Sequence, residues 1–252
     1  MQQKIDHKWN ITLKEAKQIQ NSLKERVRIQ PLKKKIHTVC GIDSAFEKKK
    51  GLCFTAAVLI SFPEMETLEE LYVVDKLQTP YIPGFLSFRE GPSIIKVLNR
   101  LTSIPDLLML DGQGIAHPRM LGIATHIGVL FDIPAIGCAK SRLLGTYDEV
   151  GKKRGDFSFL LAKKNKRIGV VLRTRDNVKP LFVSPGHLID IKASMELVLD
   201  TAKKFRLPEP TRLADKLSKK AKKLLAKRQK HRSAPTQQFS KKFLKIYIFS
   251  KL

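Results

Sequence analysis

The spacing of apolar residues predicts a helix followed by three strands in the first third of the chain. Between residues 11 and 28, apolar side chains recur about every 3.6 positions, which predicts an amphipathic helix that ends at Pro31. Three short apolar runs follow at 36–42, 52–60 and 71–77. Runs this close together are typical of an antiparallel meander, and the uninterrupted second run predicts a strand that is buried on both faces.

The next part of the chain alternates between strand-like and helix-like patterns. The predicted helices span 85–101, 118–130 and 189–203, and the predicted strands span 107–110, 133–138, 168–172 and 181–183. Pro118 occupies the favoured first position of the second of these helices. A meander followed by alternating strands and helices predicts an α/β fold, in which helices flank a mixed β-sheet.

The end of the chain differs in composition from the rest. Residues 216–252 contain 11 Lys and 2 Arg but no Asp or Glu, so we divide the chain into a main domain, 1–215, and a basic C-terminal extension, 216–252. The apolar residues Leu217, Ala221, Leu224 and Leu225 lie on one helical face, which predicts that the extension begins as a helix. Residues 233–238 are typical of a linker, and the pattern over 240–252 fits a strand, a small docking helix or a frayed end.

The charge of the chain predicts a polyanionic partner. There are 48 Lys plus Arg against 23 Asp plus Glu, a net charge of +25, and the excess is not confined to the extension. A basic protein gains affinity for nucleic acid because each phosphate that it neutralises releases counterions. The alternatives are a device for solubility or an adaptation to the RNA-rich cytoplasm of a thermophile.

Several classes of protein are excluded by the sequence. The longest apolar run, 52–60, is far shorter than the ~18 residues of a membrane span, and the first residues lack the apolar core of a secretory signal. Cys40, Cys53 and Cys138 are widely separated, which fits neither a disulfide framework nor a zinc site and favours a reducing compartment. We therefore expect a cytoplasmic protein without a membrane partner, and a monomer, since nothing in the sequence requires a dimer.

Two acidic residues stand where predicted strands end. Asp43 follows the run 36–42, and Asp111 follows the run 107–110. A single Asp in such a place is commonly a cap or a turn former. Two carboxylates on strands about 4.8 Å apart, however, can share one hard divalent cation. Such a cation converts carboxylates that repel phosphate into a clamp for a phosphodiester, so we predict a metal site at this pair.

A stiff loop precedes the helix predicted over 85–101. Its residues are Pro80, Tyr81, Ile82, Pro83 and Gly84. The prolines fix the backbone around Tyr81, so the loop is either a rigid turn packed under the helix or a wedge that enters a base stack and replaces an extruded nucleotide. Glu90, a few residues further on, is either a solvated helix residue or a ligand of a metal ion or of its bound water.

A glycine-rich loop follows Asp111. It contains Gly112, Gln113 and Gly114 and leads to His117. Glycines let a backbone approach a ligand closely, and the start of the following helix favours an anion. His117 either holds a phosphate, activates water or caps this helix. Lys140, after the strand over 133–138, is a candidate for neutralising a leaving phosphate, and Asp215 for completing the acidic cluster from a distant helix.

Six segments resemble the endonuclease V family, the deoxyinosine 3′ endonucleases. They are GIDSAFE (41–47), PYIPGFLSFREGP (80–92), PDLLMLDGQGIAHPRMLGIATHIG (105–128), IPAIGCAKSRLLG (133–145), FVSPGH (182–187) and RLPEPTRLAD (206–215). The resemblance covers about residues 8–215 and leaves out the basic extension.

This resemblance implies a fold and a reaction. The fold is an RNase H-like mixed β-sheet flanked by helices, and the enzyme is a DNA-repair endonuclease. It hydrolyses the second phosphodiester bond 3′ to a deaminated base, chiefly deoxyinosine, and leaves 3′-hydroxyl and 5′-phosphate ends. The implied cofactor is Mg²⁺, with Mn²⁺ as an alternative. The implied partner is damaged DNA, single- or double-stranded.

The resemblance also implies roles for individual residues. Asp43 and Asp111 match the metal-binding aspartates, Glu90 the catalytic glutamate, Tyr81 the wedge, His117 and Lys140 positions near the scissile phosphate, and Asp215 a late acidic position that contacts the metal directly or through water. The flipped base is expected near Gly84 and the backbone of 112–115, where amide groups read its edge.

Two other functions stay open at this point. One is an endoribonuclease that cuts inosine-containing RNA, which only a contact to the 2′-hydroxyl would distinguish from the DNA enzyme. The other is a non-catalytic nucleic-acid-binding protein, associated with chromatin or ribosomes. The acidic residues argue against the latter, because a pure binder gains nothing from carboxylates that face phosphate.

Overall fold

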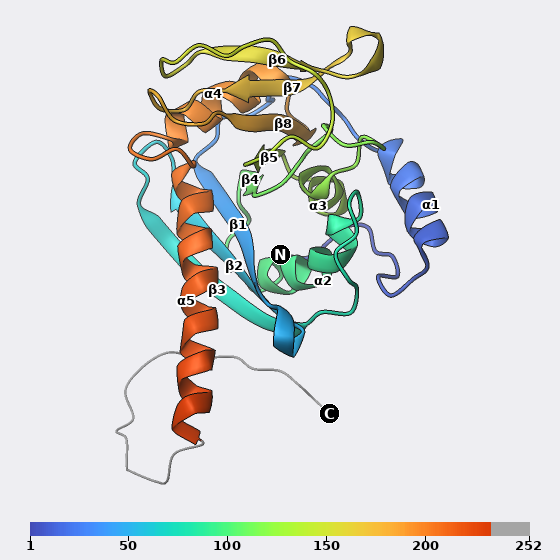
Figure 1. Cartoon of the computed structure of the whole chain (residues 1–252), viewed down its shortest axis with the longest axis vertical. Helices are drawn as coiled ribbons and strands as arrows, with labels where there is room; N and C mark the ends of the chain where they lie inside the picture. The colour runs from blue at the N-terminus through green and yellow to red at the C-terminus, as the bar shows by residue number, and fades with distance from the viewer. Residues whose placement is uncertain (233–252) are drawn as a thin grey trace.

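A mixed β-sheet of eight strands forms the centre of the molecule (Figure 1). From one edge to the other, the strands are β3 (Thr67–Lys76), β2 (Leu52–Ser61), β1 (Thr38–Glu47), β4 (Leu107–Leu110), β5 (Ala135–Ala139), β8 (Leu181–His187), β7 (Arg167–Leu172) and β6 (Phe157–Leu161). The three central strands β1, β4 and β5 are parallel, and the remaining neighbours pair antiparallel. This computed structural model describes the backbone of residues 1–232 and side chains up to residue 227.

Helices cover both faces of the sheet (Figure 1). The helices are α1 (Leu13–Lys24), α2 (Leu86–Leu98), α3 (Ile123–Phe131), α4 (Ile191–Thr201) and α5 (Glu209–Arg232), with short 3₁₀ turns η1 (Lys48–Lys50) and η2 (Lys163–Asn165). Residues of α2 and α3 belong to the hydrophobic cluster on one face, and residues of α4 and α5 belong to the cluster on the other. The sheet is therefore the middle layer of three, and α1 packs outside α3.

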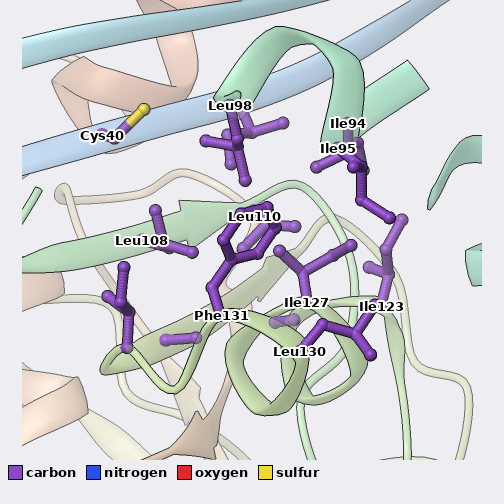
Figure 2. Packing of buried hydrophobic residues seen from close by; sticks show 14 of the residues in the cluster. Cys40, Ile94, Ile95, Leu98, Leu108, Leu110, Ile123, Ile127, Leu130 and Phe131 are labelled. Atoms are coloured by element: carbon purple, nitrogen blue, oxygen red, sulfur yellow. The ribbon is translucent and has the colours of Figure 1, made fainter. Parts of the chain in front are cut away.

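The core between the sheet and α2 and α3 is made of interdigitating aliphatic side chains. Figure 2 shows Cys40, Leu108 and Leu110 of the strands facing Ile94, Ile95 and Leu98 of α2 and Ile123, Ile127, Leu130 and Phe131 of α3. Burial of each large side chain stabilises the fold by about 1.5–3 kcal/mol. This packing fixes α2, which carries Glu90, against the strands that carry the other acids.

Most of the predicted elements are confirmed, including the meander and the strand over 107–110. The first helix is shorter than predicted: a capping box at Thr12 starts it, and it ends at Lys24, well before Pro31. The strand expected to end at residue 42 continues to Glu47, because its antiparallel pairing with β2 extends from Asp43 to the hairpin turn. β6 was not predicted, since it is short and begins with an exposed Phe157.

The helix predicted from Pro118 is also wrong in its start, because α3 begins at Ile123. Residues 117–122 instead fold back on the glycine-rich loop, where the Gly122 N–H donates to the carbonyl of Gly114 at 3.0 Å. The predicted linker at 233–238 and the alternatives for 240–252 lie outside the described residues.

A glycine in β1 lets α5 lie directly on the sheet. A Cβ atom at Gly41 would come within 2.1 Å of the backbone carbonyl of Pro210, in the first turn of α5. Gly41 and Asp43 lie on the same face of β1, because side chains alternate along a strand. The close approach therefore places α5 over the face of the sheet from which Asp43 projects.

Candidate active site

Asp43 and Asp111 lie side by side at the point where β4 ends. Ile42 pairs with Leu110 in the parallel ladder, and the Asp111 N–H donates to the Ile42 carbonyl at 3.2 Å, so the next residue of each strand is an aspartate. The proximity expected from the sequence is therefore observed. That these carboxylates bind a metal stays a prediction.

Lys140 joins this pair from the third parallel strand. It follows β5, and its Nζ forms an ion pair with Asp111 and lies 3.9 Å from Oδ1 of Asp215 on α5. Burial disfavours its charge, but the carboxylates of Asp111, Asp43 and Asp215 outweigh this and raise the pKa of Lys140. Lys140 is thus a firmly protonated ammonium among three carboxylates, and Asp215 reaches the cluster as predicted from the sequence.

Ser218, a residue of α5 that was not predicted from the sequence, contacts Asp43. The hydroxyl of Ser218, on α5, donates to Oδ2 of Asp43 at 3.1 Å, and both side chains are buried. Burial, followed by the charge of Asp111, raises the pKa of Asp43 above its ordinary value. The available signal was helical spacing: Ser218 lies three residues, or about one turn, after Asp215, on a helix that packs against β1.

Glu90 extends the acidic cluster from α2. Its side chain is buried, and burial together with the negative charge of Asp43 raises the pKa of Glu90 to about 8, although a hydrogen bond from Ser44 opposes the shift. A carboxyl group whose pKa is raised in this way retains its proton at a higher pH than an ordinary one. Glu90 is therefore a buried acid and not a solvated helix residue.

The number of acidic groups limits what kind of metal site can form. Among residues 1–232, no three His, Cys, Asp or Glu side chains converge as a ready set of metal ligands. Mg²⁺ is commonly held by one or two carboxylates, with water and substrate phosphate completing its shell. The pair Asp43 and Asp111 fits that donor set, and the repulsion that raises the pKa of Asp43 is what a shared cation would relieve.

The Pro-Tyr-Ile-Pro loop places an exposed aromatic ring beside the acids. The Tyr81 side chain is 60% exposed, and the Arg89 guanidinium lies 6.0 Å from its ring centroid and 4.6 Å from that of Phe46. Pro80 and Ile82 point elsewhere and line a pocket of about 280 Å³ against α1. Ile82 is half-buried there, whereas Pro80, Tyr81 and Pro83 are exposed, so the loop presents its tyrosine to solvent.

The end of this loop is fixed by three donors on one carbonyl. The oxygen of Gly84 accepts hydrogen bonds from Gln20 Nε2 at 3.1 Å, from an Arg119 guanidinium N–H at 2.6 Å and from His117 Nε2 at 3.1 Å. Gly84 has a φ of +79°, a conformation that glycine adopts without strain. Gln20 and Arg119 were not identified from the sequence, although the helical spacing places Gln20 on the same face of α1 as Ala16 and Leu23, which are both buried.

His117 uses both of its ring nitrogens within the fold. Because a carbonyl only accepts, Nε2 carries the proton toward Gly84, and Nδ1 accepts from the Arg119 N–H at 3.2 Å. Burial, followed by the positive charge of Arg119, lowers the pKa of His117 to about 4. The ring is therefore neutral near pH 7. The helix-cap alternative is wrong, because α3 begins five residues after Pro118.

Some of the backbone N–H groups of the glycine-rich loop already form hydrogen bonds within the fold. The Gly114 N–H donates to the Ser184 hydroxyl at 2.7 Å, and the Ile115 N–H donates to the Pro185 carbonyl at 2.8 Å. Within the described part of the chain, the N–H groups of Gly112 and Gln113 have no such partner. Of the four backbone amides expected to read a base, these two stay available.

These residues line one cleft of about 440 Å³. Its walls include Asp43, Tyr81, Gly84, Glu90, Asp111, Gly112, Gln113, His117 and Lys140. A hollow of about 460 Å³ lies at the opposite ends of β4 and β5, but its one acid, Asp132, is already paired with Lys4 and Arg28. The acids, the ammonium and the exposed tyrosine therefore meet in the first cleft.

Comparison with known proteins identifies the family. The family model described as Endonuclease V matches residues 21–216. The chain belongs to the endonuclease V family. It is 45% identical over 218 residues to the endonuclease V of Kosmotoga olearia, covering 86% of this chain and 95% of that protein.

Solved structures of the endonuclease V family show the same architecture. The Streptomyces avermitilis enzyme is 36% identical, with a TM-score of 0.82 over 90% of this chain and 100% of that one. The Ciona intestinalis enzyme, in complex with a DNA containing an inosine followed by a ribo-adenosine, is 29% identical, with a TM-score of 0.77 over 84% and 98%. The predicted RNase H-like fold and the assignment to the nucleases are therefore confirmed. No helix within residues 1–232 is both long and apolar enough to cross a membrane.

Proposed function

We propose that this endonuclease V homologue cuts DNA beside a deaminated base, with deoxyinosine as its main substrate. The observation that carries the proposal is the convergence of Asp111 and Lys140, which follow the ends of β4 and β5, with Asp43 of the adjacent strand β1, in a cleft that also contains Tyr81. The inosine-containing DNA held by the Ciona intestinalis relative supports the choice of substrate. The high positive charge of the chain suits capture of the strand.

The proposed cofactor is Mg²⁺, with Mn²⁺ as an alternative, and its ligands are Asp43 and Asp111. When bound, the ion supplies charge stabilisation at the phosphate and lowers the pKa of a bound water. Asp215 supports the pair from α5, either directly or through water. Ser218 orients the Asp43 carboxylate by donating to Oδ2, so that the other oxygen faces the cleft.

The remaining side chains act on the substrate and on protons. Lys140, as an ammonium beside Asp111, neutralises charge that develops on the phosphate. Glu90, whose pKa is raised to about 8, takes or supplies a proton at the reacting water near neutral pH. His117 is neutral and donates to Gly84, so its proposed contribution near the scissile phosphate is to shape the cleft.

Recognition of the lesion is proposed to rest on extrusion of the base. Tyr81, held on a stiff loop, fills the gap in the stack, and a weakly paired hypoxanthine is cheaper to extrude than a normal base. The flipped base then enters beside Gly84, where the N–H groups of Gly112 and Gln113 face the acceptors of its edge. Cleavage at the second phosphodiester bond 3′ to the lesion, leaving 3′-hydroxyl and 5′-phosphate ends, completes the proposal.

A second candidate substrate is inosine-containing RNA. The nucleotide after the inosine in the Ciona intestinalis complex is a ribo-adenosine, so that relative accommodates a 2′-hydroxyl at this position. Parallel assays on DNA, on RNA and on DNA with a single ribonucleotide after the inosine separate the two candidates.

The proposed setting is a monomer in the cytoplasm. Cys40, Cys53 and Cys138 are all free and buried, which suits a reducing compartment. The acids, the lysine and the tyrosine of the cleft all come from one chain, so a partner subunit is not needed to complete it.

The test is a cleavage assay on labelled duplexes that contain one inosine. The native protein is expected to cut in Mg²⁺ and not in EDTA, and Asp43→Ala is expected to bind the duplex without cutting it. Mapping the product ends checks the cut position. A cut that persists in EDTA and in the variant contradicts the metal site, and no cut on any inosine substrate contradicts the proposed function.

A further inference from the structure

One face of α5 carries a stripe of four lysines. Lys216, Lys220, Lys223 and Lys227 follow one another at spacings of four, three and four residues, which places them on one side of a helix. All four are exposed, whereas Ala214, Ser218 and Ala221 on the opposite side are buried against the sheet. The sheet-facing side of α5 thus packs the helix onto the sheet, and the four lysines take no part in this packing.

The described residues offer the stripe no carboxylate partner. Lys219 pairs with Asp215 at 2.7 Å and Lys222 lies 3.4 Å from Glu47, whereas none of the four stripe lysines has a carboxylate partner among the described residues. With a rise of 1.5 Å per residue, the stripe is about 16 Å long, and its charges are spaced by about 5–6 Å. An external anion with several charges, bound along such a row, relieves the repulsion between the lysines.

The helix begins beside the catalytic carboxylates and runs away from them. Ser218 contacts Asp43, and one turn later Lys222 donates to the Phe46 carbonyl at 2.5 Å, at the end of the β1 strand. Beyond this point α5 projects past the edge of the sheet (Figure 1). The stripe therefore starts near the acids, at Lys216, and leads away from them to Lys227.

The stripe begins where the match to the family model ends, at residue 216. The Kosmotoga olearia protein is covered to 95% by a match that uses 86% of this chain.

We infer that Lys216, Lys220, Lys223 and Lys227 form a second nucleic-acid contact, which binds the sugar–phosphate backbone on one side of the cut. The phosphates of a nucleic-acid strand are closely spaced charges in a row, and the spacing of the lysines matches them. In the proposed function such a strand is bound in the cleft, close to the start of α5. The inference rests on the proposed function for the position of the strand, but the contact itself requires no lesion and no cleavage.

The experiment compares two variants of the full-length protein that lose the same charge. In the first, the four stripe lysines are changed to glutamine. In the second, Lys152, Lys153, Lys163 and Lys164 are changed to glutamine; these exposed lysines lie in the loop before β6 and in the turn after it, at the opposite edge of the sheet. Affinity for an undamaged DNA duplex is measured by fluorescence anisotropy over a series of salt concentrations, and thermal melting checks folding.

The stripe variant is expected to bind more weakly and to lower the slope of log K against log salt by about 0.9 for each lysine that contacts duplex phosphate, and so by up to ~4. The control variant is expected to leave the slope close to that of the native protein. An unchanged slope in the stripe variant, or equal changes in both variants, overturns the inference. The same titration with an RNA duplex shows which backbone the stripe prefers.

Cleavage assays on an inosine duplex separate this inference from the proposed function. The stripe variant is expected to keep the native single-turnover rate when protein is saturating, because none of its four lysines lines the cleft. If the native protein fails to cut inosine DNA while the salt slope still falls in the stripe variant, the proposed function is wrong and the inferred contact of the stripe with nucleic acid is supported. If the native protein cuts inosine DNA and the slope is unchanged in the stripe variant, the inferred contact is wrong and the proposed function is supported.

Discussion

The side chain of Gln20, in α1, reaches the backbone of Gly84, at the end of the loop that presents Tyr81. Gln20 Nε2 donates to the Gly84 carbonyl at 3.1 Å, and its Oε1 accepts from the Arg119 guanidinium, which donates to the same carbonyl. Gln20 is completely buried. A helix outside the three layers thus holds the base of the tyrosine loop, although it contributes nothing to the acidic cluster.

Gln20→Met is therefore expected to weaken binding to an inosine duplex without slowing the chemical step. The side chain keeps its length, but the loop loses one of its three donors and the Arg119 Nε–H loses its acceptor. The dissociation constant is therefore expected to rise at least about 2- to 10-fold, which corresponds to ~0.5–1.5 kcal/mol for the neutral hydrogen bond alone. Binding is measured in EDTA and the single-turnover rate at saturating protein in Mg²⁺. Gln18→Met, an exposed position of α1, is the control. A normal dissociation constant with a slow chemical step would show that Gln20 acts on the acids and not on the loop.

Tyr81→Ala is expected to reduce the preference for inosine over undamaged duplex. A base that stacks on an aromatic side chain gains about 1–3 kcal/mol, so the affinity for the lesion is expected to fall roughly 5- to 100-fold. Tyr81→Phe keeps the ring and is expected to retain most of the native affinity. If Phe and Ala are equally impaired, the hydroxyl and not the ring is what matters, and the wedge role is contradicted.

Most of the fold could be predicted from the sequence, because the periodicity of apolar residues in most segments agrees with how those segments are buried in the folded protein. Periodicity locates the meander, the strand over 107–110 and the helices that follow it. It fails where long-range contacts decide the conformation. The segment after Pro118 has the composition of a helix, yet the Gly122 and Ala124 N–H groups are taken by carbonyls of the glycine-rich loop, so α3 begins later.

The site residues that follow or lie on adjacent strands were predicted from the sequence. The site residues that reach it from a distant helix were missed. Asp43 and Asp111 follow adjacent strands, so their proximity needs only the order of strands in the sheet. Ser218 and Gln20 reach the site from helices at the two ends of the described chain. Their contacts depend on how closely α5 and α1 pack, which for α5 is set by the absence of a side chain at Gly41.

In the absence of metal, the folded protein is expected to lose stability as the pH rises from about 5 to about 8. The pKa of Glu90 is raised from 4.5 to about 8, so in this range the unfolded chain has released a proton that the folded chain retains, and the free energy of unfolding falls with rising pH. Asp43 acts in the same direction. Thermal melting in EDTA is expected to show a smaller decline for Glu90→Gln than for the native protein.

The matched control is Glu196→Gln, which removes an exposed glutamate on α4 and is expected to keep the native pH profile. Addition of Mg²⁺ is expected to raise the melting temperature most at the high end of the range, because there the acids are most readily ionised. Parallel profiles for the native protein and Glu90→Gln would show that this carboxyl titrates normally in the folded state.

Ser218→Ala is expected to raise the Mg²⁺ concentration needed for half-maximal cleavage. The hydroxyl donates to Oδ2 of Asp43, a buried acid whose negative form is disfavoured by burial and by Asp111, so its loss makes the ionised, metal-binding form harder to reach. A hydrogen bond to a charged group contributes about 1.5–3 kcal/mol, and a loss at the lower end corresponds to roughly a 10-fold shift. Cleavage rates are measured across a Mg²⁺ titration, and saturating Mg²⁺ is expected to restore most of the native rate.

Ser194→Ala provides a close control for this change. Ser194 is buried on α4 and donates to the Asp190 carbonyl one turn earlier, and the single hydroxyl proton of Ser218 is likewise shared with the Asp215 carbonyl at 3.0 Å, but Ser194 touches none of the acids in the cleft. Both variants therefore lose a bond to their own helix, and a difference between their Mg²⁺ titrations isolates the contact with Asp43. Equal titrations would mean that Ser218 serves only the helix, and that Asp43 is oriented by the sheet alone.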